Sequence, residues 1–348
     1  MLRNFGGSIV FALVGFGLAG WYGWSETHST QAMLQALWIV LVLTVLEVSL
    51  SFDNAVVNAT VLKNMDPVWQ RRFLTWGMAI AVFGMRVAFP LAIVAIAAGI
   101  GPFDAVRLSL RNPQEYERIV SSAHVSIAGF GGAFLCLVGS KFFFDREKKL
   151  HWITAVEEQL ARFSHVPSVE IALLLVTMFA ISLLVPEAEA LAFLAAGMMG
   201  IVVFVVVEGI SKYLEFRDEA ARARGAIISS GLGGFLYLNV LDASFSFDGV
   251  IGAFALSNNM VIIAIGLSIG AMFVRSLTIM LVRKGTLAEY RYLEHGAFWA
   301  ILALGVIMLL SARYEIPEAV TGLIGALLIG ISFAWSLAHN RRHPVSSG

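Results

Sequence analysis

The sequence is almost devoid of cysteine. Cys136 is the single cysteine in 348 residues, and it lies inside an apolar run. One cysteine cannot form an intrachain disulfide, and it cannot supply the several thiolates of a zinc or iron–sulfur site. The sequence therefore predicts neither thiol redox chemistry nor a thiolate metal cluster.

Charge is also scarce. Only 14% of the residues are charged and the formal net charge is zero, whereas soluble domains carry about 25% charged residues. With no excess of positive charge, no field attracts nucleic acid, so we expect no nucleic-acid partner. A soluble globular protein is excluded on composition.

The common signatures of catalysis are missing as well. The sequence contains no Walker motif, no Gly-x-Ser-x-Gly elbow, no His-Glu-x-x-His motif and no haem signature. An ATP-driven pump or a membrane hydrolase would lack its machinery. We expect a protein that is not an enzyme, requires no cofactor and takes its energy from a gradient.

Apolar residues are abundant, at 58% of the chain with a mean hydropathy of +0.81. Runs of about 20 apolar residues can cross a bilayer as helices. The predicted fold is an all-α transmembrane bundle of about ten spans. The spans lie near residues 5–24, 32–62, 69–99, 121–144, 168–185, 189–210, 225–257, 260–283, 290–312 and 317–338. We interpret the first run as a retained span and not as a signal peptide.

Lysine and arginine fall in alternate loops. Basic residues follow the second, fourth, sixth and eighth predicted spans and close the chain, which by the positive-inside rule places these loops and both termini in the cytoplasm. We therefore expect a multi-pass protein of the bacterial inner membrane, in contact with lipid. The exception is an outer loop in which arginines face acids: Arg107, Arg111 and Arg118 with Asp104, Glu115 and Glu117.

Two segments of the chain repeat one pattern, an acid followed by Ser-x-Ser-Phe-Asp. The first begins at Glu47 and the second at Asp242, and each is followed by a glycine and an arginine nine residues apart, Gly77 with Arg86 and Gly266 with Arg275. On the predicted topology the two units are inverted, as in many secondary transporters. We predict a single membrane domain over residues 1–348, with repeats near residues 32–145 and 225–312. The accessory spans lie near residues 5–24, 168–210 and 317–338.

Both motifs lie inside runs that are longer than one crossing requires. On a regular helix Glu47, Ser51, Asn54 and Asn58 form one stripe, and Asp242, Ser246 and Gly249 form its counterpart. Asp53 and Asp248 fall outside these stripes unless the helix unwinds. We therefore expect a local break near Asn54 and near Gly249.

Ionised carboxylates at membrane depth require a counter-charge, water or a bound cation. Four of them in symmetric positions, with serines and an amide, would form an all-oxygen site for a hard divalent cation such as Mn²⁺, Ca²⁺ or Mg²⁺. The predicted ligands are Glu47, Asp53, Asn54, Asp242 and Asp248, supported by Ser51, Ser246, Asn58, Arg86 and Arg275. The two arginines could neutralise the acids when no cation is bound. The alternative is that these side chains form buried ion pairs that fix helix register.

Two other features favour structural roles. His124 and His295 lie near the ends of predicted spans and are typical of interfacial or packing histidines. The Gly129-Phe-Gly-Gly132 stretch indicates close helix packing, because small residues let transmembrane backbones approach.

The duplicated motif, from Glu47 through Asp53-Asn54 and again from Asp242 to Gly249, resembles the TerC family, in the branch catalogued as domain of unknown function 475 within the LysE-type transporter superfamily. The resemblance covers most of the chain. It implies Mn²⁺ export, metal homeostasis and a link to tellurium resistance, with Glu47, Asp53, Asn54, Asp242 and Asp248 as site positions. Gly249 stands where the first motif has Asn54, so the second half-site has one amide fewer.

Three functions follow from these observations. The first is a secondary transporter that exports a divalent cation, Mn²⁺ foremost, with protons as the counter-ion. The second is an exporter of amino acids or other small metabolites, in which the acids would bind a substrate amine. The third is a membrane scaffold for stress-response proteins, with purely structural charges. A homo-oligomer is left open.

Overall fold

The computed structural model describes residues 2–77, 79–145, 148, 150–163, 165–166, 168–223, 231–257, 259–284 and 289–342. Within these ranges the regular structure is helical and no β-strand occurs. Helices are expected in hydrocarbon, because a helix satisfies its backbone hydrogen bonds within its own segment. The prediction of an all-α helical bundle is confirmed.

Seven helices in the described part of the chain are long and apolar enough to cross a membrane. They cover Phe5–Ser25, Thr30–Leu50, His124–Phe143, Glu187–Ala220, Met260–Arg283, Leu293–Ser311 and Val320–Arg341. The other three predicted spans fall on shorter apolar helices, Arg86–Ala95, Val169–Ser182 and Leu232–Phe245. Large apolar side chains on these helices are exposed, among them Leu13 at 69%, Leu191 at 76% and Leu323 at 69%. Exposed apolar surface on this scale suits a lipid environment, and the chain is a multi-pass membrane protein.

The chain forms two compact units, each assembled from separate stretches of sequence. Unit 1 consists of Met1–Ser51, Met65–His124 and Ala221–Met280, and unit 2 of Phe52–Asn64, Val125–Ala220 and Leu281–Gly348. The first motif is divided between them, because the boundary falls between Ser51 and Phe52. The two units are described in turn.

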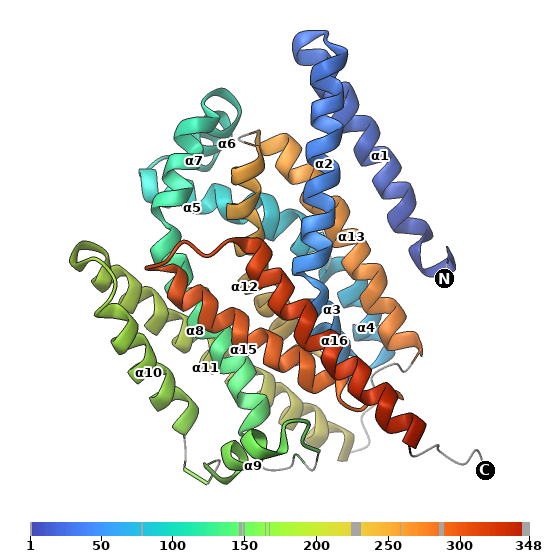
Figure 1. The fold of residues 1–348 in the computed structure, drawn as a ribbon, viewed down its shortest axis with the longest axis vertical. Coiled ribbons are helices and arrows are strands. Elements are labelled where there is room, and N and C mark those ends of the chain that lie inside the picture. The colour runs from blue at the N-terminus through green and yellow to red at the C-terminus, as the bar shows by residue number, and fades with distance from the viewer. Residues whose placement is uncertain are drawn as a thin grey trace. The chain divides into compact units, whose positions relative to one another are not determined.

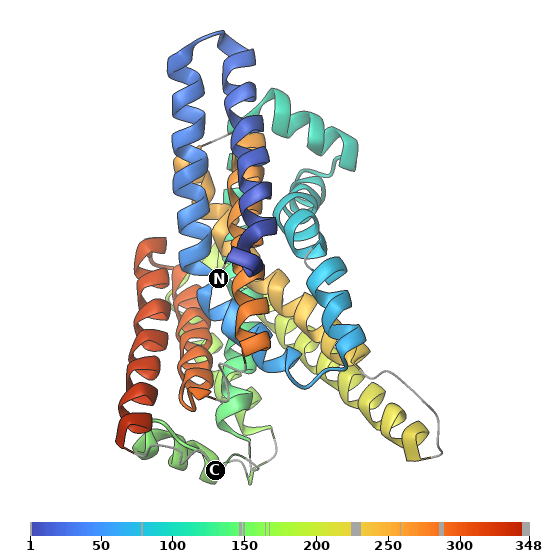
Figure 2. The same cartoon turned by 90° about the vertical axis from the view of Figure 1, so that its right-hand side faces the viewer.

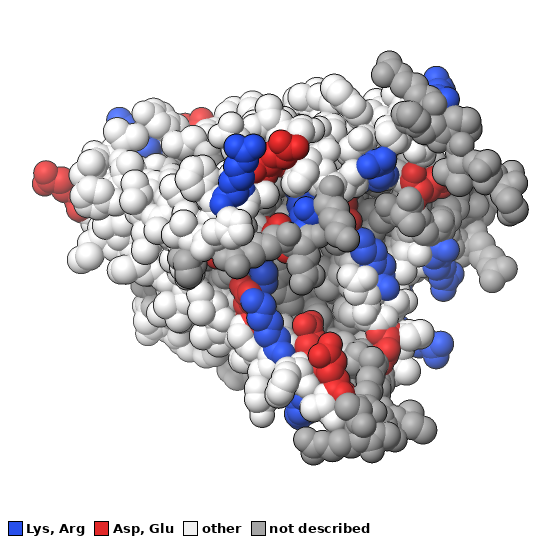
Figure 3. Space-filling view, turned by 90° about the horizontal axis from the view of Figure 1, so that it is seen from below, with Lys and Arg blue, Asp and Glu red and all other residues white. Residues whose placement is uncertain are grey.

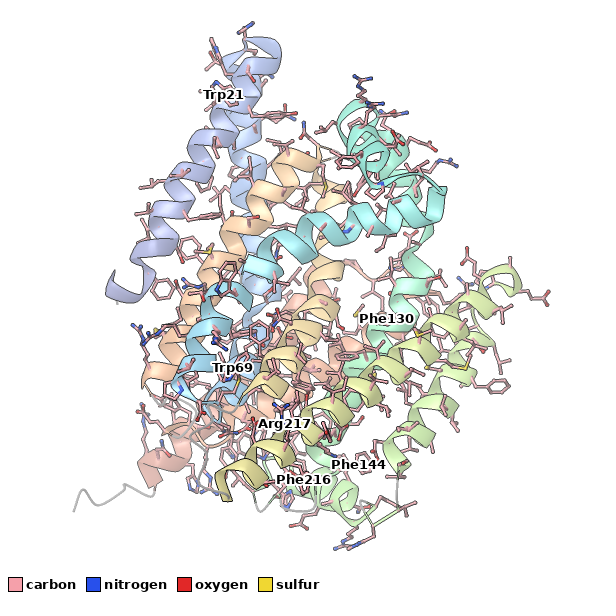
Figure 4. The ribbon with its side chains drawn as sticks, turned by 180° about the vertical axis from the view of Figure 1, so that it is seen from behind. Trp21, Trp69, Phe130, Phe144, Phe216 and Arg217 are labelled. Atoms are coloured by element: carbon pink, nitrogen blue, oxygen red, sulfur yellow. The ribbon has the colours of Figure 1, made fainter. Side chains whose placement is uncertain are left out.

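Unit 1 begins with a hairpin of α1 (Leu2–Thr27) and α2 (Thr30–Leu50), which lie side by side in Figures 1 and 2. After residue 65 come α4 (Pro67–Arg72), η1 (Phe73–Gly77), η2 (Ile80–Ala88), α5 (Phe89–Ala98), α6 (Pro102–Arg111) and α7 (Pro113–Ser122). The unit is completed by α12 (Leu232–Leu256), which packs on α2, η1, η2 and α7, and by most of α13 (Met260–Lys284). Trp69 of α4, labelled in Figure 4, packs its ring on Phe235 of α12 with centroids 5.7 Å apart.

The predicted span over residues 69–99 is not one regular helix. Residues 73–77 and 80–88 form π-helical turns between α4 and α5. A π-helix bonds each N–H to the carbonyl five residues back and often occurs at functional sites. Apolar composition alone does not distinguish this winding from a regular helix, which is why the sequence predicted a continuous span.

Helices α2 and α13 approach closely at Gly266 and Gly270 of α13. A Cβ added at Gly266 would lie 2.6 Å from Leu43 Cβ, and one added at Gly270 would lie 2.5 Å from Glu47 Cβ. The Thr44 hydroxyl donates to the Gly266 carbonyl at 3.2 Å. Glycines four residues apart are a recurrent contact between membrane helices, because they let two backbones come together.

Gly270→Ala is expected to destabilise the protein. The added methyl group would also lie 3.1 Å from the Thr44 carbonyl oxygen, a backbone atom, so the two helices must separate. Overpacking of this kind costs about 1–3 kcal/mol, and thermal unfolding of the detergent-solubilised protein measures it. Gly330→Ala on α16 is the control, because nothing lies within 4 Å of a Cβ there. Equal melting temperatures for the two variants would contradict the close α2–α13 contact.

Unit 2 contains α3 (Phe52–Leu62), α8 (His124–Phe143), α9 (Thr154–Phe163), α10 (Val169–Ser182), α11 (Glu187–Ala223), α15 (Leu293–Ser311) and α16 (Glu318–Arg342). Helices α15 and α16 form a hairpin, visible in Figures 1 and 2, and α3 packs against both of them. The prediction for the glycines of α8 is confirmed. A Cβ at Gly129 would lie 2.6 Å from the Phe193 carbonyl of α11, and one at Gly132 would lie 2.9 Å from the Gly305 carbonyl of α15.

Ion pairs link helices of unit 2. Lys63, after α3, lies 3.0 Å from Glu294 at the start of α15. Glu208 of α11 accepts from Lys141 of α8 at 2.6 Å and from Lys212 at 2.5 Å. Three basic residues that the positive-inside argument used, Lys63, Lys141 and Lys212, are thus each paired with an acid of unit 2. Figure 3, seen from below the view of Figure 1, shows both basic and acidic side chains on that face.

Candidate functional site

Glu47 is a buried acid in the last turn of α2. Its residue is 2% exposed, and its Oε1 accepts hydrogen bonds from the Ser51 hydroxyl at 2.8 Å and from the Arg86 guanidinium. Arg86 comes from η2 and is itself 5% exposed. A buried carboxylate in a membrane helix is stable as an ion when a positively charged side chain and a hydroxyl group donate hydrogen bonds to it. Arg86 is therefore a counter-charge of Glu47, which fits both the predicted neutralisation of an empty cation site and the alternative of a buried structural ion pair.

Two glycines leave space around Glu47. A Cβ at Gly249 of α12 would lie 3.2 Å from Glu47 Oε2, and Gly270 of α13 faces the stem of the same side chain. A larger residue at either position would crowd the carboxylate. Gly249, which occupies the place in the second motif that Asn54 has in the first, therefore faces Glu47.

The helix that carries the first motif is broken at Ser51. Helix α2 ends at Leu50 and α3 begins at Phe52, and Ser51 has φ −99° and ψ 16°, outside helical values. The Ser51 N–H still bonds to the Glu47 carbonyl at 3.0 Å. The predicted break is present but occurs three residues before Asn54. In the second motif the prediction of a break near Gly249 is wrong, because α12 is continuous from Leu232 to Leu256 and packs against four other elements.

Because of the break, Asp53 and Asn54 lie in the first turn of α3, in unit 2. Asp53 is 5% exposed and Asn54 is 7% exposed. Asp53 Oδ1 accepts from the Asn54 backbone N–H at 2.8 Å, and a carboxylate is favourable in a first helical turn, where N–H groups are free. On α16 a Cβ at Gly325 would lie 3.7 Å from Asp53 Oδ2, so this face of α16 leaves room beside the carboxylate.

The amides of α3 add oxygen atoms to this buried acid. Asn54 Oδ1 is buried and accepts no hydrogen bond from the described residues. Asn58, one turn further along α3, is 2% exposed. A buried carbonyl oxygen without a donor is costly, and a cation is one partner that would satisfy it.

The second motif lies on α12 in unit 1. Asp242 is 4% exposed. The side chains of Ser246 and Asp248 lie outside the described part of the structure. Among the described side chains, no group of three or more His, Cys, Asp or Glu residues could hold a metal ion, a search that leaves Asp248 out.

Arg275 does not have the same partner as Arg86. Its Nε donates to the Leu74 carbonyl at 2.6 Å, within the π-helical turn of residues 73–77. The sequence paired the two arginines as equivalent counter-charges. The structure instead gives Arg86 a carboxylate and Arg275 a backbone carbonyl.

Sequence reasoning missed a polar cluster around Glu157 of α9. Glu157 is fully buried and accepts from Lys148 at 2.9 Å, the Trp299 indole at 3.1 Å and two backbone N–H groups, Trp152 and Ile153. The Lys148 ammonium also lies over the rings of Phe142 and Phe143. No local signal separates Glu157 from its exposed neighbour Glu158, because only the tertiary fold buries one of them.

His295 packs in this cluster as the sequence predicted for it. It is 4% exposed, its Nε2 lies 2.8 Å from the Leu150 carbonyl, and its ring meets Phe142 edge-on with centroids 5.2 Å apart. These contacts join the start of α15 to the segment between α8 and α9. His295 is thus part of the packing of unit 2.

A protein-family model matches most of the chain. The model of a family described as "Protein of unknown function (DUF475)" matches residues 52–343, well over half of the chain. The matched region includes Asp53, Asn54, Asp242 and Asp248 and begins five residues after Glu47. Comparison with curated proteins and with solved structures gave no match. The chain is a membrane protein that belongs to the DUF475 family.

Proposed function

We propose that this protein is a secondary transporter that exports a divalent cation, with Mn²⁺ as the first candidate, and that it is related to the TerC family and the LysE-type superfamily. The observation that carries the proposal is the helix break at Ser51, with a buried carboxylate in the turn before it and another in the turn after it. Secondary transporters commonly bind their ions at discontinuous membrane helices, where helix ends and freed backbone groups meet the substrate.

The chemistry of the buried side chains supports a hard cation. Glu47, Asp53, Asn54 and Asp242 present oxygen atoms and no sulfur or imidazole, the ligand set that suits Mn²⁺, Ca²⁺ and Mg²⁺. Burying a carboxylate in a membrane costs about 2.5–3.5 kcal/mol or more. That cost is a reason to expect a cation as partner. With Asp248, these residues are the proposed ligands.

Arg86 gives the proposal a mechanism for release. Its guanidinium and an incoming cation would compete for the Glu47 carboxylate, so binding of one favours departure of the other. Protons are the proposed counter-ion, since the chain has no ATP-binding motif. Arg275 donates to the Leu74 carbonyl and would take no part in the competition for the Glu47 carboxylate.

Arg86→Gln is therefore expected to tighten Mn²⁺ binding and to slow transport. Glutamine keeps a hydrogen-bond donor near Glu47 but removes the competing charge. A tightening of about tenfold corresponds to about 1.4 kcal/mol. Isothermal titration of the purified protein measures the affinity, and Arg275→Gln is the matched control that should leave it unchanged. Unchanged affinity and flux in the Arg86→Gln, Arg275→Gln double variant would exclude Arg86 from the transport cycle.

The test of the proposed function is cation uptake into proteoliposomes that contain the purified full chain. Mn²⁺, Ca²⁺, Mg²⁺ and Zn²⁺ are compared under an imposed proton gradient, with protein-free liposomes as the control. Saturable Mn²⁺ uptake that collapses with a protonophore is expected. Absence of uptake for every cation would refute the proposal. Uptake of amino acids without metal would favour a metabolite exporter, and copurifying proteins without any flux would favour a scaffold.

A further inference from the structure

Unit 1 contains an apolar pocket whose lining includes no residue of the acidic motifs. Its volume is about 450 Å³, within the range of roughly 300–1,000 Å³ that is common for small-molecule sites. The walls come from α1, the η2–α5 segment, α6 and α13. The lining includes Val14, Leu18, Leu91, Val106, Leu110 and Ala264. Its polar side chains are two serines, Ser109 and Ser268, so a water-soluble ligand would find almost no hydrogen-bond partner there.

Helix α6, one wall of this pocket, is amphipathic. Phe103, Val106 and Leu110 follow one another at three- and four-residue spacing and are 90%, 40% and 59% exposed. The residues one position later are charged and form an adjoining stripe: Asp104, Arg107 and Arg111. A short helix with an exposed apolar stripe beside a charged one is typical of the membrane interface.

The charged stripe of α6 carries a surplus of positive charge. Arg107 pairs with Asp104 at 3.8 Å, with both side chains more than 60% exposed. Arg111 makes no ion pair with any described residue, whereas Arg118 of α7 is held by Glu115 at 2.6 Å. An exposed arginine at the interface attracts anionic lipid headgroups. Its guanidinium fork also matches a phosphate.

We propose that this pocket binds an acyl chain of an anionic phospholipid, whose headgroup phosphate is held by Arg111. Two independent observations meet here: an almost wholly apolar pocket in a membrane protein, and an exposed arginine, without an ion pair among the described residues, on the amphipathic helix that forms one of its walls. Such a lipid would fill the space between α1, α6 and α13. The proposal concerns unit 1 alone and does not depend on whether a cation is transported.

Native mass spectrometry of the full-length protein in detergent tests the proposal, with phosphatidylglycerol and phosphatidylcholine added separately. The wild type should retain phosphatidylglycerol preferentially. Ala264→Phe, which fills the pocket, should lower the retained fraction by about tenfold. Gly17→Phe on α1 is the matched control, because Gly17 does not line the pocket and a Cβ there meets nothing within 4 Å. It should retain lipid as the wild type does.

Two exposed positions on α6 provide variants that are not expected to impair folding. Leu110→Gln should weaken retention of both lipids, and Arg111→Gln should remove the preference for phosphatidylglycerol, whereas Arg118→Gln should not. Retention by Ala264→Phe and Leu110→Gln equal to that of the wild type would overturn the proposal. So would equal retention of the two lipids by the wild type, or a lipid-free dimer in which a second copy of the chain covers the pocket.

Discussion

Asp53→Asn is expected to abolish proton-coupled Mn²⁺ flux in proteoliposomes while leaving the protein folded. Asparagine keeps the size of the side chain and the oxygen that accepts from the Asn54 N–H, so the first turn of α3 should survive. The substitution removes one negative charge from a buried oxygen cluster. Loss of a charged ligand should weaken Mn²⁺ binding by at least about tenfold, or about 1.4 kcal/mol.

Asp104→Asn is the matched control for this variant. Asp104 carries the same side chain but lies on α6, with 63% of the side chain exposed, so its flux should equal that of the wild type. Asp248→Asn tests the second motif in the same assay and should also lose flux. Full transport by Asp53→Asn would exclude Asp53 from the ligand set.

Glu157→Gln is expected to cause the largest loss of stability in unit 2. The substitution would leave the Lys148 ammonium, whose side chain is 7% exposed, without its negative partner. Breaking a buried ion pair by removing one member costs about 3–5 kcal/mol. Chemical denaturation in detergent measures the loss, and Glu158→Gln, at the exposed neighbouring position, should change stability little. A Glu157→Gln protein as stable as the wild type would show that the cluster adds nothing to folding.

The same cluster predicts a loss of stability in acid. Burial raises the pKa of Glu157. The hydrogen bond and charge of Lys148, the hydrogen bond from the Trp299 indole and the charge of His295 together lower this pKa by more, so in the folded protein it lies below the ordinary value of 4.5. A folded-state pKa below the unfolded one means that the unfolded chain binds the proton more readily. The stabilisation is therefore complete above pH about 4.5 and is lost as pH falls through the folded pKa. Glu157→Gln should remove this part of the acid dependence.

The helices of the bundle could be predicted from the sequence because length and apolarity decide them. Each predicted span corresponds to a helix or a group of helices, and seven meet the length and apolarity of a crossing. The predicted spans 168–185 and 189–210 correspond to the separate helices α10 and α11. The glycines of α8 could be predicted to pack, because a small side chain in an apolar run has few other roles.

The winding of the helices could not be predicted in the same way. Ser51 and Ser246 occupy the same place in the two motifs, yet the helix breaks at Ser51 whereas α12 continues through residue 246. The distant partners of the two motifs differ: Glu47, which bonds to Ser51, is held by Arg86 of η2, whereas α12 packs on α2, η1, η2 and α7. Tertiary packing thus overrides the similarity of the two motifs.

The candidate site shows the same division between local pattern and tertiary contact. The burial of Glu47, Asp53, Asn54 and Asp242 is as the sequence predicted for polar residues in apolar runs. The partners were less predictable, because Arg86 and Arg275 have equivalent spacing but different acceptors. Glu157 could not be singled out, since its burial depends on Trp299, which lies 142 residues away in sequence.

The most direct test of the central claim is a Mn²⁺ titration of the purified full-length protein, followed by electron paramagnetic resonance of the free ion. Wild type and Asp104→Asn should remove Mn²⁺ from solution saturably and alike, and Asp53→Asn should require at least about ten times more protein to do so. Equal binding by Asp53→Asn and wild type, or no saturable binding by the wild type, would contradict a cation site at the broken helix.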